Sequence, residues 1–187
     1  WLNGNLVGGW PYGYNSFRLD LTPYLNFDGE NQLAIRLDNP NYSARWYPGG
    51  GLYRNVWLTK TNKVHVSHWG TTVSTSNVSK DSAKIDLEVK VENNSDSNSN
   101  ISVLTKIYEF NNDQIQAHIA TIDQKNISIS AGGNRTIQGS ATVVNPKLWG
   151  PPPSQTPYLY KAITSIRNEK GPIDQYETIF GIRDIKL

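Results

Sequence analysis

A chain of 187 residues with 11% aromatic residues is long enough for one large or two small folded domains, and it is too aromatic to be disordered. The formal net charge is only +2 and the lysines and arginines are scattered, which excludes a concentrated phosphate-binding surface; we expect no nucleic-acid partner. There is no cysteine, so disulfides and thiol chemistry are excluded, and no apolar run approaches the roughly 20 residues of a membrane helix, so no membrane contact is expected.

Residues 1–62 alternate short apolar runs with turn signals. Asn3-Gly4-Asn5 predicts a hairpin turn. Residues 17–21 and 33–38 alternate apolar and polar side chains, as half-buried strands do. Only about four strands fit here, too few to close a sandwich. We therefore expect the back half of a β-sandwich, and we expect the chain to be a piece of a longer protein because Trp1 reads as mid-strand sequence.

The stretch 45–58 combines three consecutive glycines with a proline, four aromatic residues and two arginines. Glycines allow positive φ angles or close approach of the backbone to another surface, and the large rings beside them indicate a shaped loop. A tight turn leading into a strand over 52–58 accounts for this pattern. A phosphate-binding loop does not, because no Gly-Lys-Ser/Thr follows.

A second unit begins at Val64. Residues 85–91 alternate apolar and charged side chains and predict a strand with one wet face, followed by a polar hairpin tip over 93–100. Further strands are expected over 101–110, 115–122, 127–129, 136–144, 158–167 and 175–182, with an irregular proline-rich segment over 146–157. About seven strands over this length are typical of an immunoglobulin-like sandwich.

No set of residues forms a recognisable active site, so no catalytic residue, metal site or cofactor is predicted. His65 and His68 have an odd separation that points them to opposite faces of a strand. Asp86 and Glu88 share a face, but they alternate with lysines and are expected to be a solvated surface. No serine lies in a Gly-x-Ser-x-Gly elbow.

Several segments, in order, resemble the glycoside hydrolase family 2 enzymes, the β-galactosidases and β-glucuronidases. The stretch 45–58 is similar to a family signature, and residues 3–39 are similar to its jelly-roll domain. Pro146-Lys147-Leu148-Trp149-Gly150 with Pro157-Tyr158-Leu159-Tyr160 resembles a motif of its immunoglobulin-like domain, and Phe180-Gly181-Ile182-Arg183 resembles the junction before its catalytic barrel.

The resemblance implies an all-β chain in three parts. Residues 1–62 would be the C-terminal part of a galactose-binding-like jelly roll, residues 63–183 an immunoglobulin-like β-sandwich, and residues 184–187 the start of a linker to a (β/α)₈ barrel. The parent would be a retaining, β-galactosidase-like hydrolase with two barrel glutamates as acid/base and nucleophile. This chain would then be a non-catalytic region that braces the barrel and shapes one wall of its cleft. The alternative is a stand-alone carbohydrate-binding or adhesion module.

Counting within the family signature places Arg45 where relatives often carry an aspartate that reaches the active-site rim. We therefore expect Arg45, Trp46 and Tyr47 to contact the carbohydrate substrate in the parent, although arginine departs from the galactose-type pattern. The alternatives are an ion pair between Arg45 and an acidic residue of a neighbouring domain, and packing of Trp46 and Tyr47 in an interdomain seam. The barrel is the expected protein partner, and unpaired edges of the incomplete first unit predict self-association of the fragment. The family resemblance implies a bacterial periplasmic or secreted location, with the cytoplasm as the other option.

Overall fold

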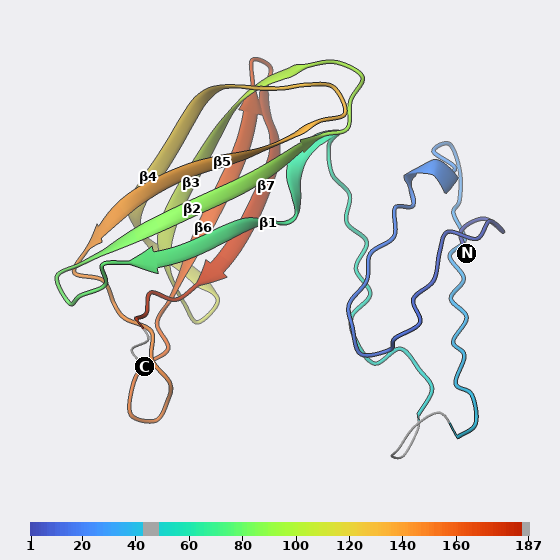
Figure 1. Cartoon of the computed structure of the whole chain (residues 1–187), viewed down its shortest axis with the longest axis horizontal. Helices are drawn as coiled ribbons and strands as arrows, with labels where there is room; N and C mark the ends of the chain where they lie inside the picture. Colours follow the sequence, from blue (N-terminus) through green and yellow to red (C-terminus); the bar gives the residue numbers. More distant parts are fainter. Residues whose placement is uncertain (43–48, 185–187) are drawn as a thin grey trace. The chain divides into compact units, whose positions relative to one another are not determined.

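The computed structural model of the chain describes residues 1–42 and 49–184. The chain divides into two compact units, Trp1–Leu58 and Thr59–Leu187 (Figure 1). Regular secondary structure consists of seven strands, all in the second unit, and one short 3₁₀ turn, η1 (Thr22–Tyr24), within these described residues. They contain no helix with the length and apolar character needed to cross a bilayer.

The second unit is a sandwich of two antiparallel sheets. One sheet has the order β1-β2-β5, formed by β1 (Val64–Ser76), β2 (Ser82–Asn93) and β5 (Asn134–Val144). The other has the order β4-β3-β6-β7, formed by β3 (Ser99–Asn111), β4 (Gln114–Ile129), β6 (Leu159–Asn168) and β7 (Gly171–Phe180). This topology confirms the all-β class and the predicted immunoglobulin-like sandwich.

The core follows from the alternation seen in the sequence. In β2, Ile85, Leu87, Val89 and Val91 are all less than 5% exposed, while the residues between them are polar. Isoleucines and valines of β3, β4 and β6 meet them from the opposite sheet. Because side chains alternate across a strand, one run of inward-facing residues per strand is enough to join the two sheets.

Two predicted features of the second unit were wrong. The segments 115–122 and 127–129 belong to one strand, β4, which continues through an irregularity where Asn126 has φ of 57°. Residues 94–98 do not close a hairpin, because β2 and β3 lie in different sheets and the segment crosses between them. The strand that begins at Val64 extends to Ser76, beyond a bulge that interrupts its alternation.

The first unit differs most from expectation. The Asn3-Gly4 turn is confirmed, with Leu2 and Asn5 paired and both turn residues at positive φ. However, 17–21, 33–38 and 52–58 are not strands, and apolar residues expected to be covered are exposed, including Phe17, Ile35 and Trp57. A strand requires a hydrogen-bonded neighbour as well as alternation, and in the described part of this unit the bridges are limited to Leu2 with Asn5 and Leu33.

A buried threonine pair between β3 and β6 offers a test of the core. Thr105 and Thr164 are each 1% exposed, and their hydroxyls share a hydrogen bond of 2.8 Å. Thr105→Val should cost about 1–3 kcal/mol in the free energy of unfolding, because the Thr164 hydroxyl loses its partner in a dry site. The double variant with valine at both positions should return close to the wild-type value, since both polar groups are gone. Urea denaturation of the four proteins in this cycle measures the difference, and an additive double variant would contradict the pairing.

Candidate functional site

The residues predicted to touch sugar, Arg45, Trp46 and Tyr47, lie outside the described residues, so their role stays a prediction. The glycine-rich stretch is described from Gly49 onward. Gly51 has φ of 150°, and the Tyr53 hydroxyl donates to the Gly13 carbonyl at 3.3 Å. The Arg54 guanidinium lies 5.2 Å from the centre of the Tyr53 ring, an arrangement that stabilises both side chains.

The best-defined constellation is the place where the chain leaves the sandwich. The two motifs singled out in the sequence, 146–160 and 180–183, meet there, and Figure 1 shows the loop before β6 beside the C-terminal segment. The Trp149 N–H donates to the Ile182 carbonyl at 2.8 Å, and Ile182 is fully buried. We call Lys147, Trp149, Tyr160, Gly181, Ile182 and Arg183 the exit cluster.

Trp149 is held from two sides. The Arg183 guanidinium lies over its ring at 5.2 Å, a cation–π contact. Gly181 packs so closely that a Cβ at that position would lie 2.7–2.9 Å from three atoms of Trp149. A glycine is needed here because of this close approach, since any side chain would displace the indole.

Tyr160 anchors the other half of the exit cluster. Its ring is 1% exposed and stacks on Phe180 at 5.7 Å between ring centres. Its hydroxyl accepts from the backbone N–H of Lys147 at 2.8 Å and donates to the backbone carbonyl of the same residue at 3.2 Å. Burial raises the pKa of this hydroxyl, which keeps the proton that the second hydrogen bond requires. The arrangement resembles the tyrosine corner of immunoglobulin-type domains.

The Lys147 side chain extends the cluster to the surface. Its Nζ lies 2.8 Å from Glu109 Oε2, and this hydrogen bond raises the pKa of Lys147. The shallow depression beside the pair, lined in part by Asn111, Gln116 and Tyr158, has room for only about one water molecule. A depression of this size cannot hold a pyranose ring.

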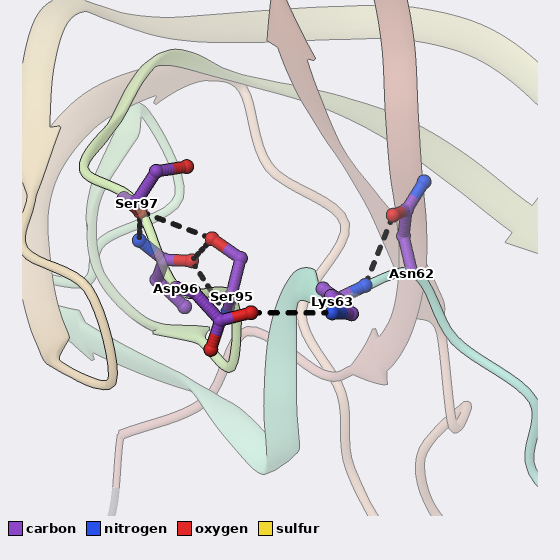
Figure 2. A network of polar contacts seen from close by, with 6 residues as sticks. Asn62, Lys63, Ser95, Asp96 and Ser97 are labelled. Atoms are coloured by element: carbon purple, nitrogen blue, oxygen red, sulfur yellow. Dashed lines mark hydrogen bonds and ion pairs between the residues drawn. The ribbon is translucent and has the colours of Figure 1, made fainter.

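A second polar cluster lies where the chain enters the sandwich (Figure 2). The Asn94 N–H donates to the Lys63 carbonyl at 2.8 Å, and the Lys63 ammonium lies 4.0 Å from Asp96. The adjacent Asn93 is fully buried. Its side-chain NH₂ donates to the carbonyls of Ser97, Ile129 and Ser130, and its side-chain oxygen accepts from the Ser95 backbone N–H. The prediction of a hairpin tip over 93–100 did not identify Asn93 as a buried residue. The signal was available, because Asn93 continues the inward alternation of 85–91.

The remaining titratable residues that the sequence singled out have structural partners. Asp86 binds Lys84 at 2.6 Å and accepts from Ser76, and these contacts lower its pKa. Glu88 is exposed and accepts from Gln138. His65 is buried beside Glu92, whereas His68 is exposed. In residues 1–42 and 49–184 no three His, Asp or Glu side chains converge as metal ligands.

These features define the class of the second unit as an immunoglobulin-like β-sandwich whose C-terminal segment is firmly held. The sequence model described as glycosyl hydrolases family 2 matches residues 64–183. The chain belongs to this family.

Individual relatives agree with the assignment. A beta-galactosidase of Bacteroides ovatus is 38% identical over the whole chain, which covers 21% of that protein. A beta-glucuronidase of Formosa agariphila is 31% identical over 98% of the chain, which covers 20% of that protein. A solved family 2 member from Bacteroides cellulosilyticus has a TM-score of 0.90 at 30% identity, over all of this chain and 23% of that one. The chain thus spans about a fifth of the length of the curated relatives it matches.

Proposed function

We propose that this chain is an accessory region of a larger β-galactosidase-like hydrolase, and that its sandwich positions the catalytic domain that follows. The observation that carries the proposal is the exit cluster. On the side of the loop before β6, the Trp149 backbone N–H donates to the Ile182 carbonyl, and on the side of β1 the Thr75 hydroxyl donates to the Arg183 carbonyl at 3.0 Å. A segment bonded from two sides leaves the sandwich in one direction, which is what a domain that braces its neighbour needs.

In the proposed parent, hydrolysis retains the anomeric configuration and uses two glutamates outside residues 1–187. One glutamate attacks the anomeric carbon, and the other protonates the leaving oxygen and then activates water. This chain contributes no group to those steps. Arg45, Trp46 and Tyr47 are proposed to contact the sugar at the rim of the cleft, where an arginine can donate to hydroxyls or to a carboxylate. The beta-galactosidase and beta-glucuronidase named above make these two substrate classes the first to test.

The test compares three proteins with nitrophenyl β-galactoside and nitrophenyl β-glucuronide. We expect no turnover by the 187-residue chain, and turnover of one substrate by the parent. The parent without residues 1–187 should lose at least about tenfold in kcat/KM, because misplacement of a catalytic domain by about 1 Å can cost more than that. Full activity of the shortened parent would contradict the accessory role. Turnover by the chain alone would contradict the proposal that the catalytic glutamates lie outside residues 1–187. A parent reading frame that encodes no barrel would contradict the same proposal.

A further inference from the structure

The first strand of the sandwich carries a feature that the exit cluster does not use. Val66 pairs with Val91 and Thr71 pairs with Val89, so four residues of β1, Ser67 to Gly70, lie opposite the single residue Lys90. We call this segment the β1 bulge. Bulges at sheet edges commonly redirect side chains, and β1 is an edge strand.

The backbone of the β1 bulge is strained at its tryptophan. Trp69 has φ of 53°, a conformation that bulky residues rarely adopt. The next residue, Gly70, is packed against the main chain: a Cβ there would lie 2.7 Å from the Ser67 carbonyl oxygen and 2.8 Å from that of Lys90. Strain of this kind persists when the surrounding structure holds it in place, and it is concentrated at binding sites.

The Trp69 side chain is displayed to solvent. It is 72% exposed, although burying its ring would stabilise the fold. The His68 ring stacks on it with 4.7 Å between centres and 25° between planes. This stacking orients the indole before any ligand arrives, which lowers the entropy cost of binding.

The surroundings of Trp69 distinguish between kinds of ligand. Within β1 and β2, all of whose residues are described, Trp69 is the one exposed large hydrophobic residue. The exposed neighbours along the strand and across the ladder are Thr72, Ser74, Glu88 and Lys90. A dry protein interface needs a contiguous apolar patch, which is lacking here. A sugar ring has an apolar face of C–H groups edged by hydroxyls, and an aromatic face among hydroxyl and charged side chains complements it.

We propose that the β1 bulge is a binding platform for pyranose rings of a polysaccharide, with the Trp69 indole as the stacking surface. The choice of a polysaccharide as ligand rests on the proposed function. The site itself rests on the strain, exposure and surroundings of Trp69.

Native affinity electrophoresis of the 187-residue chain tests the proposal, with β-1,4-galactan or hyaluronan cast in the gel and a non-binding protein as mobility reference. These polymers display β-galactose and β-glucuronate units. We expect the wild type to be slowed in at least one gel, Trp69→Gly to migrate like the reference, and Trp69→Phe to keep part of the retardation. Trp57→Ala is the matched control, because Trp57 is 80% exposed in the other unit, and it should be slowed like the wild type.

A melting experiment separates binding from structure. Glycine adopts positive φ without strain, so Trp69→Gly should melt within about 2 °C of the wild type or above it. A wild type that is not slowed in either gel would overturn the proposal, as would a Trp69→Gly variant that is slowed like the wild type. A melting temperature lowered by more than about 5 °C would make Trp69 a structural residue and also overturn it. Hydrolysis plays no part in these measurements, so their failure is distinguishable from failure of the proposed function.

Discussion

Asn93→Ala is expected to lower the free energy of unfolding of the sandwich by about 3 kcal/mol. The Asn93 side chain donates to the Ser97 carbonyl at 2.9 Å, the Ser130 carbonyl at 3.1 Å and the Ile129 carbonyl at 3.2 Å, the last of these in a fully buried environment. It also accepts from the Ser95 N–H at 3.1 Å. Each buried group left without a partner costs about 1–3 kcal/mol, and alanine restores none of these bonds.

The measurement is urea denaturation followed by tryptophan fluorescence, with calorimetry as a second probe. A loss of this size should lower the melting temperature by about 10 °C for a domain of this length. Asn94→Ala is the matched control, because Asn94 is adjacent and its side chain is exposed. Its cost should stay within about 0.5 kcal/mol, as for ordinary surface substitutions. Equal losses in the two variants would show that Asn93 does not hold this end of the sandwich.

Gly181→Val is expected to disrupt the exit cluster. The valine Cβ would lie within 3 Å of Trp149 Cβ, Cγ and Cδ1, so the indole must move away from its contact with Arg183. Overpacking of this kind costs about 1–3 kcal/mol. Hydrogen exchange should accelerate at the Trp149 N–H, which bonds to the Ile182 carbonyl.

A double-mutant cycle isolates the cause of that loss. In a Trp149→Ala background the clashing ring atoms beyond Cβ are absent, so Gly181→Val should cost about 1 kcal/mol less than in the wild type. Ile179→Val is a suitable control, because Ile179 is nearby on β7 and 52% exposed. Additivity of the two substitutions would contradict direct packing of Gly181 on Trp149. In the parent enzyme, the same variant should lower kcat/KM if the exit cluster positions the catalytic domain.

Local patterns were enough to predict the sandwich. Alternation in 85–91 placed four buried residues correctly, because the side-chain period of a strand is a property of the backbone itself. The two motifs at 146–160 and 180–183 were also identified from sequence. The sequence did not predict that the two motifs meet at the exit cluster. They are separated along the chain, and they come together only when β6 pairs with β7.

Features that depend on the hydrogen-bonding and strand partners of a residue were determined only by the tertiary structure. Asn93 continues an apolar alternation, and only the carbonyls of Ser97, Ile129 and Ser130 around it explain why a polar side chain is buried there. The strands expected in 1–58 had the right alternation, but pairing is a long-range property, and among the described residues of these expected strands only Leu33 has a bridge partner, Leu2. The sequence by itself determined the all-β class and the family resemblance. The fold alone placed Trp69 on a strained bulge, because the register of β1 against β2 sets which residues are left unpaired.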